Sequence, residues 1–480
     1  MPPATKTGRA ARFDPQSGGR DFLLACALAL LCAAATGAVA ADGEQSQPQS
    51  GVAGSEFAFD FPGVAIGVGE YEDGPTGATV ILFQKPVVAV VDVRGGSPGT
   101  INTDKLRLGY DSPFVSAITI SGGSSYGLAF ATGVADALKA TTQGANTWEH
   151  RVTVVGAVVW DLGTRRYSAI TPDENLARRA VREARPGVFS LGAHGAGRMT
   201  WQGGYFGDYQ HSGQGAALRQ SGVTKVLVFT VVNAYGSVVD RRGHVVRCAR
   251  PVSDDCGTIA DRMRTHLSRL GPVKIAASAD SDDPSSTHNT TVTVVITNQK
   301  LPIWSLQRLA VQVHTSMARA IQPFNTASDG DSLFAATTGE VDNPSLGSED
   351  LGTLASEAAW DAVLASVPVL PDRRPTTPIT VSAALLDSYA GSYEFAPGVI
   401  GVVRRNESGL DIKVTGYDTL YLPAGQAVRL VAVAADEFVL ASERGDRLRF
   451  DRDSRGKING LTIEPGPWPV RAQRLANSSK

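Results

Sequence analysis

HNTTVTVVIT, residues 288–297, places a small side-chain amide, Asn289, directly before a run of threonine and branched aliphatic residues. Alternation of threonine with valine is typical of a half-buried β-strand, because β-branched side chains suit a pleated surface. The stretch therefore predicts a polar loop that ends at Asn289 and a strand that opens at Thr290.

This junction also has the residues that it would need to cut itself. Attack of the Thr290 hydroxyl on the Asn289 carbonyl would give an ester, and hydrolysis of that ester would leave Thr290 as a new N-terminus. A free α-amine has a pKa of about 7.7–8.0, so it can accept the proton of the hydroxyl beside it. Two other interpretations stay open on the junction alone: an ordinary strand entrance, and an N-glycosylation acceptor at Asn289-Thr290-Thr291.

The composition is that of a globular protein with a sizeable core. The chain has 480 residues, of which 42% are hydrophobic, and this length suits two or three domains. Its formal net charge of -2 argues against nucleic acid as a partner, because binding to phosphates requires clustered basic residues. We therefore set nucleic acid aside as a partner.

Residues 1–40 have the pattern of a secretory signal peptide. Basic residues precede an apolar run at residues 22–35, and Ala38-Val39-Ala40 is a small-x-small cleavage site. The run is too short to span a bilayer. We expect an exported protein, periplasmic or extracellular, with no integral membrane segment in the mature chain and a disordered stretch at residues 41–54.

Removal of the signal peptide would leave two cysteines, Cys248 and Cys256, which are separated by a loop-like segment. Export favours a disulfide between them. Neither lies near histidines at the spacing of zinc ligands, and the histidines are scattered along the chain. The sequence therefore predicts no metal and no cofactor.

Changes of pattern along the chain predict two folded parts. In residues 55–366, the apolar runs at 80–83 and 87–93 predict two paired strands. Helical patterns follow at 304–321 and 354–366. Strands and helices together indicate a layered α/β domain. Residues 367–378 form a proline-rich linker. Short alternating runs in residues 379–478 predict a small all-β domain.

Three further motifs carry polar groups next to predicted strands. Gly123-Ser124-Ser125-Tyr126-Gly127 matches the G-x-S-x-G pattern of a nucleophile elbow. No downstream Asp and His stand out as its partners, which favours a tight turn or a substrate-binding loop with Ser125 and Tyr126. Asn233 ends a buried strand, where it would either donate to an oxyanion or cap a turn. Asp329 and Asp331 flank a glycine, and they would orient an ammonium group and accept a proton, or simply form a turn.

Taken in order, these motifs resemble the self-processing L-aminopeptidase/D-esterase family, which includes the β-peptidyl aminopeptidases. The resemblance covers roughly residues 55–345. The matching stretches are residues 89–96 (AVVDVRGG), 120–128 (ISGGSSYGL), 232–236 (VNAYG), 289–291 (NTT) and 329–334 (DGDSLF).

The resemblance implies a four-layer αββα sandwich of the aminopeptidase/ornithine-acetyltransferase type, similar to N-terminal-nucleophile hydrolases. It implies a precursor that is cut after Asn289, with Thr290 as nucleophile and Asn233 as oxyanion donor. Asp329 and Asp331 stand where the family holds the groups that orient the nucleophile and its amine. The expected product is an aminopeptidase that takes small peptides, amides or esters and assembles as a homo-oligomer of cleaved protomers.

The chain differs from well-known members of that family in its threonine nucleophile, its Asp/Asp pair and an enlarged cysteine-bearing region before the cut. Three alternative functions therefore stay open. They are an acyltransferase of the ornithine-acetyltransferase type, an esterase with Ser125 as nucleophile, and a non-catalytic exported binding protein.

Overall fold

The computed structural model of the chain describes residues 56–72, 74–111, 113–141, 151–162, 169–248, 256–269, 289–367, 377–407, 409–416, 422–441, 446–463 and 468–476. The predicted signal peptide at residues 1–40, the stretch at 41–54 and most of the predicted linker at 367–378 lie outside these residues. No helix in the part that the structure describes is both long and apolar enough to cross a membrane.

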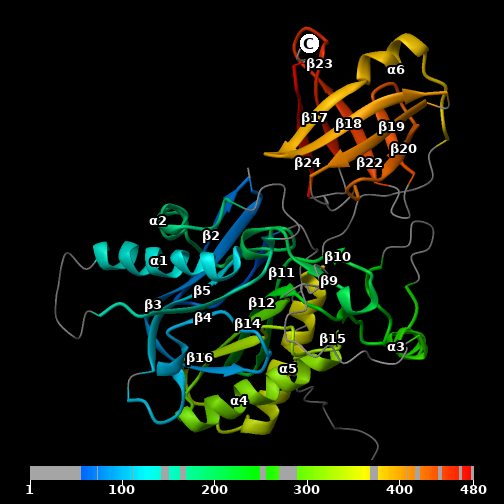
Figure 1. Cartoon of the computed structure of the whole chain (residues 1–480). Coiled ribbons are helices and arrows are strands. Elements are labelled where there is room, and N and C mark those ends of the chain that lie inside the picture. The colour runs from blue at the N-terminus through cyan, green and yellow to red at the C-terminus, as the bar shows by residue number, and fades with distance from the viewer. Residues whose placement is uncertain are drawn as a thin grey trace, which may run out of the picture. The chain divides into compact units, whose positions relative to one another are not determined.

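A ten-stranded mixed sheet forms the framework of the larger folded part (Figure 1). Its main path follows the order β11-β12-β14-β16-β3-β5-β6-β4, and β2 pairs with β3 and with β7 off this path. The strands are β11 (Gln214–Ser221), β12 (Thr224–Asn233), β14 (Thr290–Gln299), β16 (Ser332–Val341), β3 (Thr76–Val93), β5 (Phe114–Ser121), β6 (Val154–Val158), β4 (Thr100–Ile101), β2 (Val64–Tyr71) and β7 (Arg185–Pro186).

The prediction that residues 80–83 and 87–93 form two paired strands was wrong. Both runs belong to the single strand β3, whose first part pairs with β2 and β5 and whose last part pairs with β16. The pairing with β5 slips between Leu82 and Val87. Pro86 lies in this exposed, irregular section, where its missing N–H breaks no ladder hydrogen bond.

Helices cover the strands from two sides (Figure 1). Helices α1 (Leu128–Thr141) and α2 (Glu174–Arg182) pack on one side, against β6 and β2. Helices α4 (Ile303–Ser316) and α5 (Ser348–Ala365) pack on the other side, against β3, β16, β11 and β12. Apolar side chains fill the space between the helices and the strands on both sides, and a further core lies between strands.

Strand β14 lies at the centre of this packing, because β12 and β16 flank it on its two edges. Every residue from Thr290 to Gln299 is buried, although the alternating sequence predicts a half-buried strand. Val294 joins the core between strands, whereas Val295 joins the core beneath α4 and α5. The threonines are accommodated by pairing, as in the 2.8 Å contact between the hydroxyls of Thr293 and Thr230.

The C-terminal part is a closed antiparallel β-barrel that follows a short helix, α6 (Ala383–Tyr389). Its strands correspond to the short alternating runs that predict an all-β domain in residues 379–478. Buried aromatic rings such as Tyr393, Phe438 and Phe450 fill its core. The strands are β17 (Gly391–Ala396), β18 (Val399–Asn406), β19 (Gly409–Thr415), β20 (Ala427–Ala432), β21 (Glu437–Leu440), β22 (Arg447–Arg452), β23 (Ile458–Ile463) and β24 (Val470–Arg474).

Candidate active site

The junction between Asn289 and Thr290 lies at the entrance of β14, where each residue is 4% exposed. The Thr290 hydroxyl donates a hydrogen bond to the carbonyl oxygen of Asn289, with an Oγ1–O distance of 2.6 Å. The hydroxyl is therefore adjacent to the carbonyl group that it would attack in self-cleavage.

A backbone donor from the neighbouring loop reaches the same carbonyl. Asn289 forms a parallel bridge with Asp329, and the Gly330 N–H donates to the Asn289 oxygen at 2.7 Å. A Cβ atom on residue 330 would lie 2.6 Å from Thr290 Oγ1, so this approach requires glycine. A backbone N–H directed at a carbonyl oxygen is able to stabilise the oxyanion that forms on attack.

Asp329 is 2% exposed, and donors from two segments hold its carboxylate. Oδ1 accepts from the Tyr235 N–H at 3.2 Å. Oδ2 accepts from the N–H of Thr326 at 3.0 Å and from its hydroxyl at 2.7 Å. Burial raises the pKa of Asp329, although these hydrogen bonds oppose the increase.

Asp331 is completely buried. Its Oδ1 accepts from the Thr291 N–H at 2.6 Å, and its Oδ2 accepts from the Asn325 N–H at 2.9 Å. Burial raises the pKa of Asp331 well above its usual range, and the neighbouring charge of Asp329 raises it further. Ionisation of Asp329 therefore opposes ionisation of Asp331 on the other side of Gly330.

The glycine-rich loop after β3 donates backbone hydrogen bonds to the main chain of this acidic pair. The Gly95 N–H donates to the carbonyl oxygen of Asp331 at 3.1 Å, and the Ser97 N–H donates to that of Asp329 at 2.8 Å. A Cβ atom on residue 95 would lie 2.2 Å from the backbone nitrogen of Asp331. Glycine at this position thus allows two backbone segments to come into direct contact.

Asn233 lies opposite Thr290 in the antiparallel pairing of β12 with β14. Its side-chain oxygen accepts from the Trp201 N–H at 3.1 Å, and its Nδ2 donates to the carbonyl oxygen of Trp160 at 2.9 Å. These contacts fix the orientation of the amide. Nδ2 carries a second hydrogen, so the buried amide has a donor for a developing negative charge.

Ser125 and Tyr126 lie in a short 3-10 turn, Ser124–Gly127. Tyr126 is 69% exposed. The left-handed backbone of the turn falls on Ser124, with a φ of 53°, rather than on Ser125. A nucleophile elbow places the strained backbone on its serine, so this turn differs from that motif.

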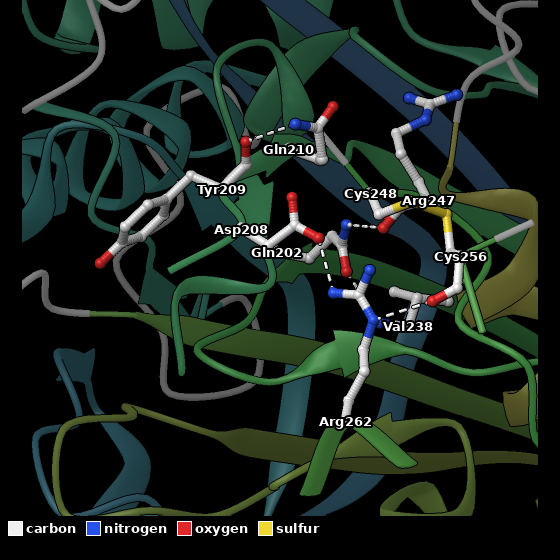
Figure 2. Close-up of a disulfide and its surroundings, with 9 residues drawn as sticks. All are labelled: Gln202, Asp208, Tyr209, Gln210, Val238, Arg247, Cys248, Cys256 and Arg262. Carbon is white, nitrogen blue, oxygen red and sulfur yellow. Dashed lines mark hydrogen bonds and ion pairs between the residues drawn. A yellow bond between two sulfur atoms is a disulfide. The ribbon is translucent and has the colours of Figure 1, made fainter. Parts of the chain in front are cut away.

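Cys248 and Cys256 form a disulfide with an S–S distance of 2.04 Å (Figure 2). It precedes α3 (Ile259–Ser268), whose first turn is capped by the Thr258 hydroxyl. Within the described ranges, no three His, Cys, Asp or Glu side chains are grouped as metal ligands would be. The geometry of the site thus consists of a hydroxyl, an amide, two carboxyl groups and backbone N–H donors.

Comparison with known proteins covers the same part of the chain. Residues 58–371 match the sequence model of peptidase family S58. The chain belongs to peptidase family S58. This membership confirms the resemblance inferred from the separate motifs and makes the chain a hydrolase of peptide or amide bonds.

Two relatives illustrate the range of the family. The chain is 39% identical over 319 residues to the 6-aminohexanoate-oligomer endohydrolase of Paenarthrobacter ureafaciens. The aligned region covers 64% of this chain and 84% of that protein. The chain is 35% identical over 274 residues to an uncharacterized aminopeptidase of Mycobacterium tuberculosis, which covers 56% of this chain and 75% of the relative. Among solved structures, the L-aminopeptidase D-Ala-esterase/amidase of Ochrobactrum anthropi aligns with a TM-score of 0.47 and 17% identity, over 66% of this chain and 87% of that one.

The structure brings Asn289, Thr290, Asn233, Asp329 and Asp331 together. Sequence reasoning missed the donor role of the Gly330 N–H and the hydroxyl of Thr326 on Asp329. The glycine between two aspartates was the available signal for the first of these. No motif marked Thr326.

Proposed function

We propose that the protein cuts itself between Asn289 and Thr290 and then hydrolyses amide bonds with Thr290 as its N-terminal nucleophile. The proposal rests above all on the Asn289 carbonyl, which lies 2.6 Å from the Thr290 hydroxyl and accepts the Gly330 N–H at 2.7 Å. A nucleophile on one side of a carbonyl and a donor to its oxygen are the two elements of acyl transfer.

Self-cleavage would proceed in two steps. In the first, Thr290 Oγ1 bonds to the Asn289 carbonyl carbon, the C–N bond breaks and the hydroxyl proton moves to the released nitrogen, which leaves an ester. In the second, water attacks the ester carbonyl, Thr290 regains its hydroxyl, and Asn289 becomes a C-terminal carboxylate. The buried pair of Asp329 and Asp331 would carry protons in these steps, because it flanks Gly330, whose N–H donates to the carbonyl under attack.

The mature enzyme would then repeat this chemistry on a substrate. The new α-amine of Thr290, with an ordinary pKa of about 7.7–8.0, takes the proton of its own hydroxyl as the oxygen attacks. Asn233 stabilises the oxyanion through Nδ2. Asp331 and Asp329 orient the amine, and water releases the acyl group.

Small peptides and amino-acid amides are the first candidate substrates, which would make the protein an aminopeptidase. A second candidate is the internal amide bond of a linear oligomer, as in the name of the endohydrolase relative. One observation favours it: the oxygens of Asp329 and Asp331 are buried and accept hydrogen bonds from the protein, so neither presents an exposed carboxylate to a substrate ammonium group.

Three features of the chain complete the proposal. The predicted signal peptide at residues 1–40 would export the precursor. The three hydrophobic cores formed by the strands and by the helices on their two sides fit a four-layer αββα sandwich. Acyl transfer to an amine would need the same residues as hydrolysis, so added amines that divert the acyl group would favour the transferase alternative.

Intact mass of the purified protein tests the proposal. The wild type should give two fragments that break between Asn289 and Thr290, and Thr290→Ala should remain a single chain without amidase activity. Ser125→Ala is the matched control and should retain both cleavage and activity. A wild-type protein that stays in one piece would refute self-processing, and loss of esterase activity in Ser125→Ala would then favour the elbow.

A further inference from the structure

The region that bears the disulfide carries a group of aromatic rings in contact with one another: Tyr205, Phe206, Tyr235 and His266, called here the aromatic group. The centroid of the Tyr205 ring lies 4.4 Å from that of the His266 ring and 5.6 Å from that of the Tyr235 ring. Phe206 contacts both Tyr205 and His266 edge to face. All four residues are half-buried, so their rings keep accessible surface.

Backbone hydrogen bonds connect this group to the candidate active site. Tyr235 follows Asn233 by two residues, and its N–H donates to Asp329 Oδ1 at 3.2 Å. The carbonyl oxygen of Tyr235 accepts the Tyr205 N–H at 2.8 Å. Tyr235 therefore belongs to the aromatic group through its ring and to the site of Thr290 through its backbone.

Helix α3, which contributes His266, is held in place by an ion pair and a backbone contact (Figure 2). Arg262 in this helix pairs with Asp208 at 2.6 Å, and both side chains are largely buried. The Arg262 Nε also donates to the carbonyl oxygen of Cys256 at 2.9 Å. The charges of Arg262 and Asp208 offset each other, so this pair presents no unbalanced charge beside the rings.

Gln202 precedes the turn Gly204–Phe206, which carries Tyr205, and its side chain contacts the disulfide segment. Figure 2 shows Gln202 beside Arg247 and Cys248. Its Nε2 donates to the carbonyl oxygen of Arg247, directly before Cys248, at 3.1 Å. Its Oε1 accepts the Val238 N–H at 2.9 Å. The disulfide between Cys248 and Cys256 closes this arrangement, which fixes the rings relative to the site.

We propose that the aromatic group is a substrate-binding subsite for amides that carry an aromatic or apolar chain next to the scissile bond. The inference rests on the proposed function, since it places the chain of a substrate whose carbonyl is attacked by Thr290. Half-exposed rings bury a large apolar area at small entropic cost and favour edge-to-face contact with a further ring. Through His266, the enlarged region before the cut thereby contributes to specificity.

Hydrolysis of two matched substrates tests this subsite. Ammonia release from phenylalaninamide and from glycinamide is measured with the wild type, His266→Ala and Tyr205→Leu. Each variant should raise the KM for phenylalaninamide by on the order of 10-fold and leave the kcat/KM for glycinamide unchanged. Tyr205→Phe keeps the ring and should behave as the wild type.

Leu267→Ala is the matched control, because Leu267 is the neighbour of His266 in α3 and is 55% exposed outside the aromatic group. Appearance of the two fragments in each variant shows that it has folded and processed itself. Equal losses on both substrates, or a wild type that does not favour phenylalaninamide, would overturn the subsite. Failure of the wild type to cleave itself would instead refute the proposed function.

Discussion

Gly330 is closely surrounded by other residues of the candidate site. Its N–H donates to the carbonyl of Asn289, and the space where a side chain would begin is taken by Thr290 Oγ1 at 2.6 Å and by Ser97 O at 2.8 Å. The same residue therefore supplies a donor and leaves room for the nucleophile. Asp329 and Asp331 on its two sides anchor it to separate segments.

Gly330→Ala should slow self-cleavage by on the order of 100-fold, because the added methyl group displaces the Thr290 hydroxyl and misplacement of a reacting atom by about 1 Å has an effect of this size. Gel electrophoresis of the precursor over time measures the rate. Gly347→Ala, where a Cβ atom meets nothing closer than 3.8 Å, is the control and should be cleaved at the wild-type rate. Rapid cleavage of Gly330→Ala would contradict this view of the site.

The raised pKa of Asp331 predicts how the stability of the precursor depends on pH. Burial and Asp329 raise this pKa well above 3.8 in the folded state, so the folded chain binds more protons than the unfolded chain between 3.8 and the raised value. The free energy of unfolding contributed by Asp331 therefore falls as pH rises through this window. Urea denaturation of Thr290→Ala across pH should show this decrease.

The double variant Thr290→Ala/Asp331→Asn is the comparison for that measurement. Asparagine does not ionise, so the difference in pH dependence between the two proteins reports the titration of Asp331 together with its effect on the coupled Asp329. Parallel pH profiles would show that the Asp331 carboxyl group is not perturbed.

At the scale of secondary-structure elements, a buried polar contact joins α4 to β3. His314 in α4 is 1% exposed, and its Nδ1 lies 3.0 Å from Asp92 Oδ2 in β3. Arg94, at the start of the glycine-rich loop, contacts the same carboxylate oxygen at 2.6 Å. Burial lowers the pKa of His314 below 6.5, although Asp92 opposes the decrease.

His314→Ala should lower the free energy of unfolding by about 1–3 kcal/mol, because it removes a partner of a largely buried carboxylate. The wild type should also lose stability as pH falls below 6.5, since the unfolded histidine then binds a proton that the folded one resists. His314→Gln should lack this loss. His244→Ala, at a histidine whose side chain is 48% exposed, is the control for denaturation in urea and should match the wild type.

The sequence predicted elements best where the pattern repeats over many residues. The spacing of Leu306, Leu309 and Val313 predicted α4, and the Thr/Val alternation predicted β14. The prediction from the sequence pattern failed at β3, because the irregular, exposed Gln-Lys-Pro section inside this strand has the composition of a turn. Burial of β14 on both faces depends on layers contributed by distant segments, which local periodicity does not encode.

Within the candidate site, side chains were easier to predict than backbone groups. Thr290, Asn233 and the two aspartates stood out because their side chains have recognisable chemistry. The N–H groups of Gly330 and Tyr235 were not predictable as donors, since every residue except proline has one and only the fold decides its direction. The contact of Gly95 with Asp331 likewise arises from two loops far apart in the sequence.

At the scale of the whole molecule, the site and the barrel draw on separate sets of residues. The groups around Thr290 come from residues 94–331, whereas the core of the barrel is built from residues 385–472. A chain that ends at residue 367 should therefore cleave itself at the rate of the full-length protein. Fragment appearance on a gel measures this rate, and a decrease of about 10-fold or more would show that the barrel assists processing.

The strand order β12-β14-β16-β3 means that a cut before Thr290 would not release either fragment. Strands β14 and β16 would belong to the second fragment, while β12 and β3, which flank them, would belong to the first. The two fragments would share one sheet with alternating strands. Refolding from urea would therefore become a second-order reaction between two fragments that originally folded as one chain. After dilution from urea, the uncut Thr290→Ala chain should regain its native fluorescence at any protein concentration. The cleaved protein should recover poorly when dilute, so its folded state would depend on having folded before the cut.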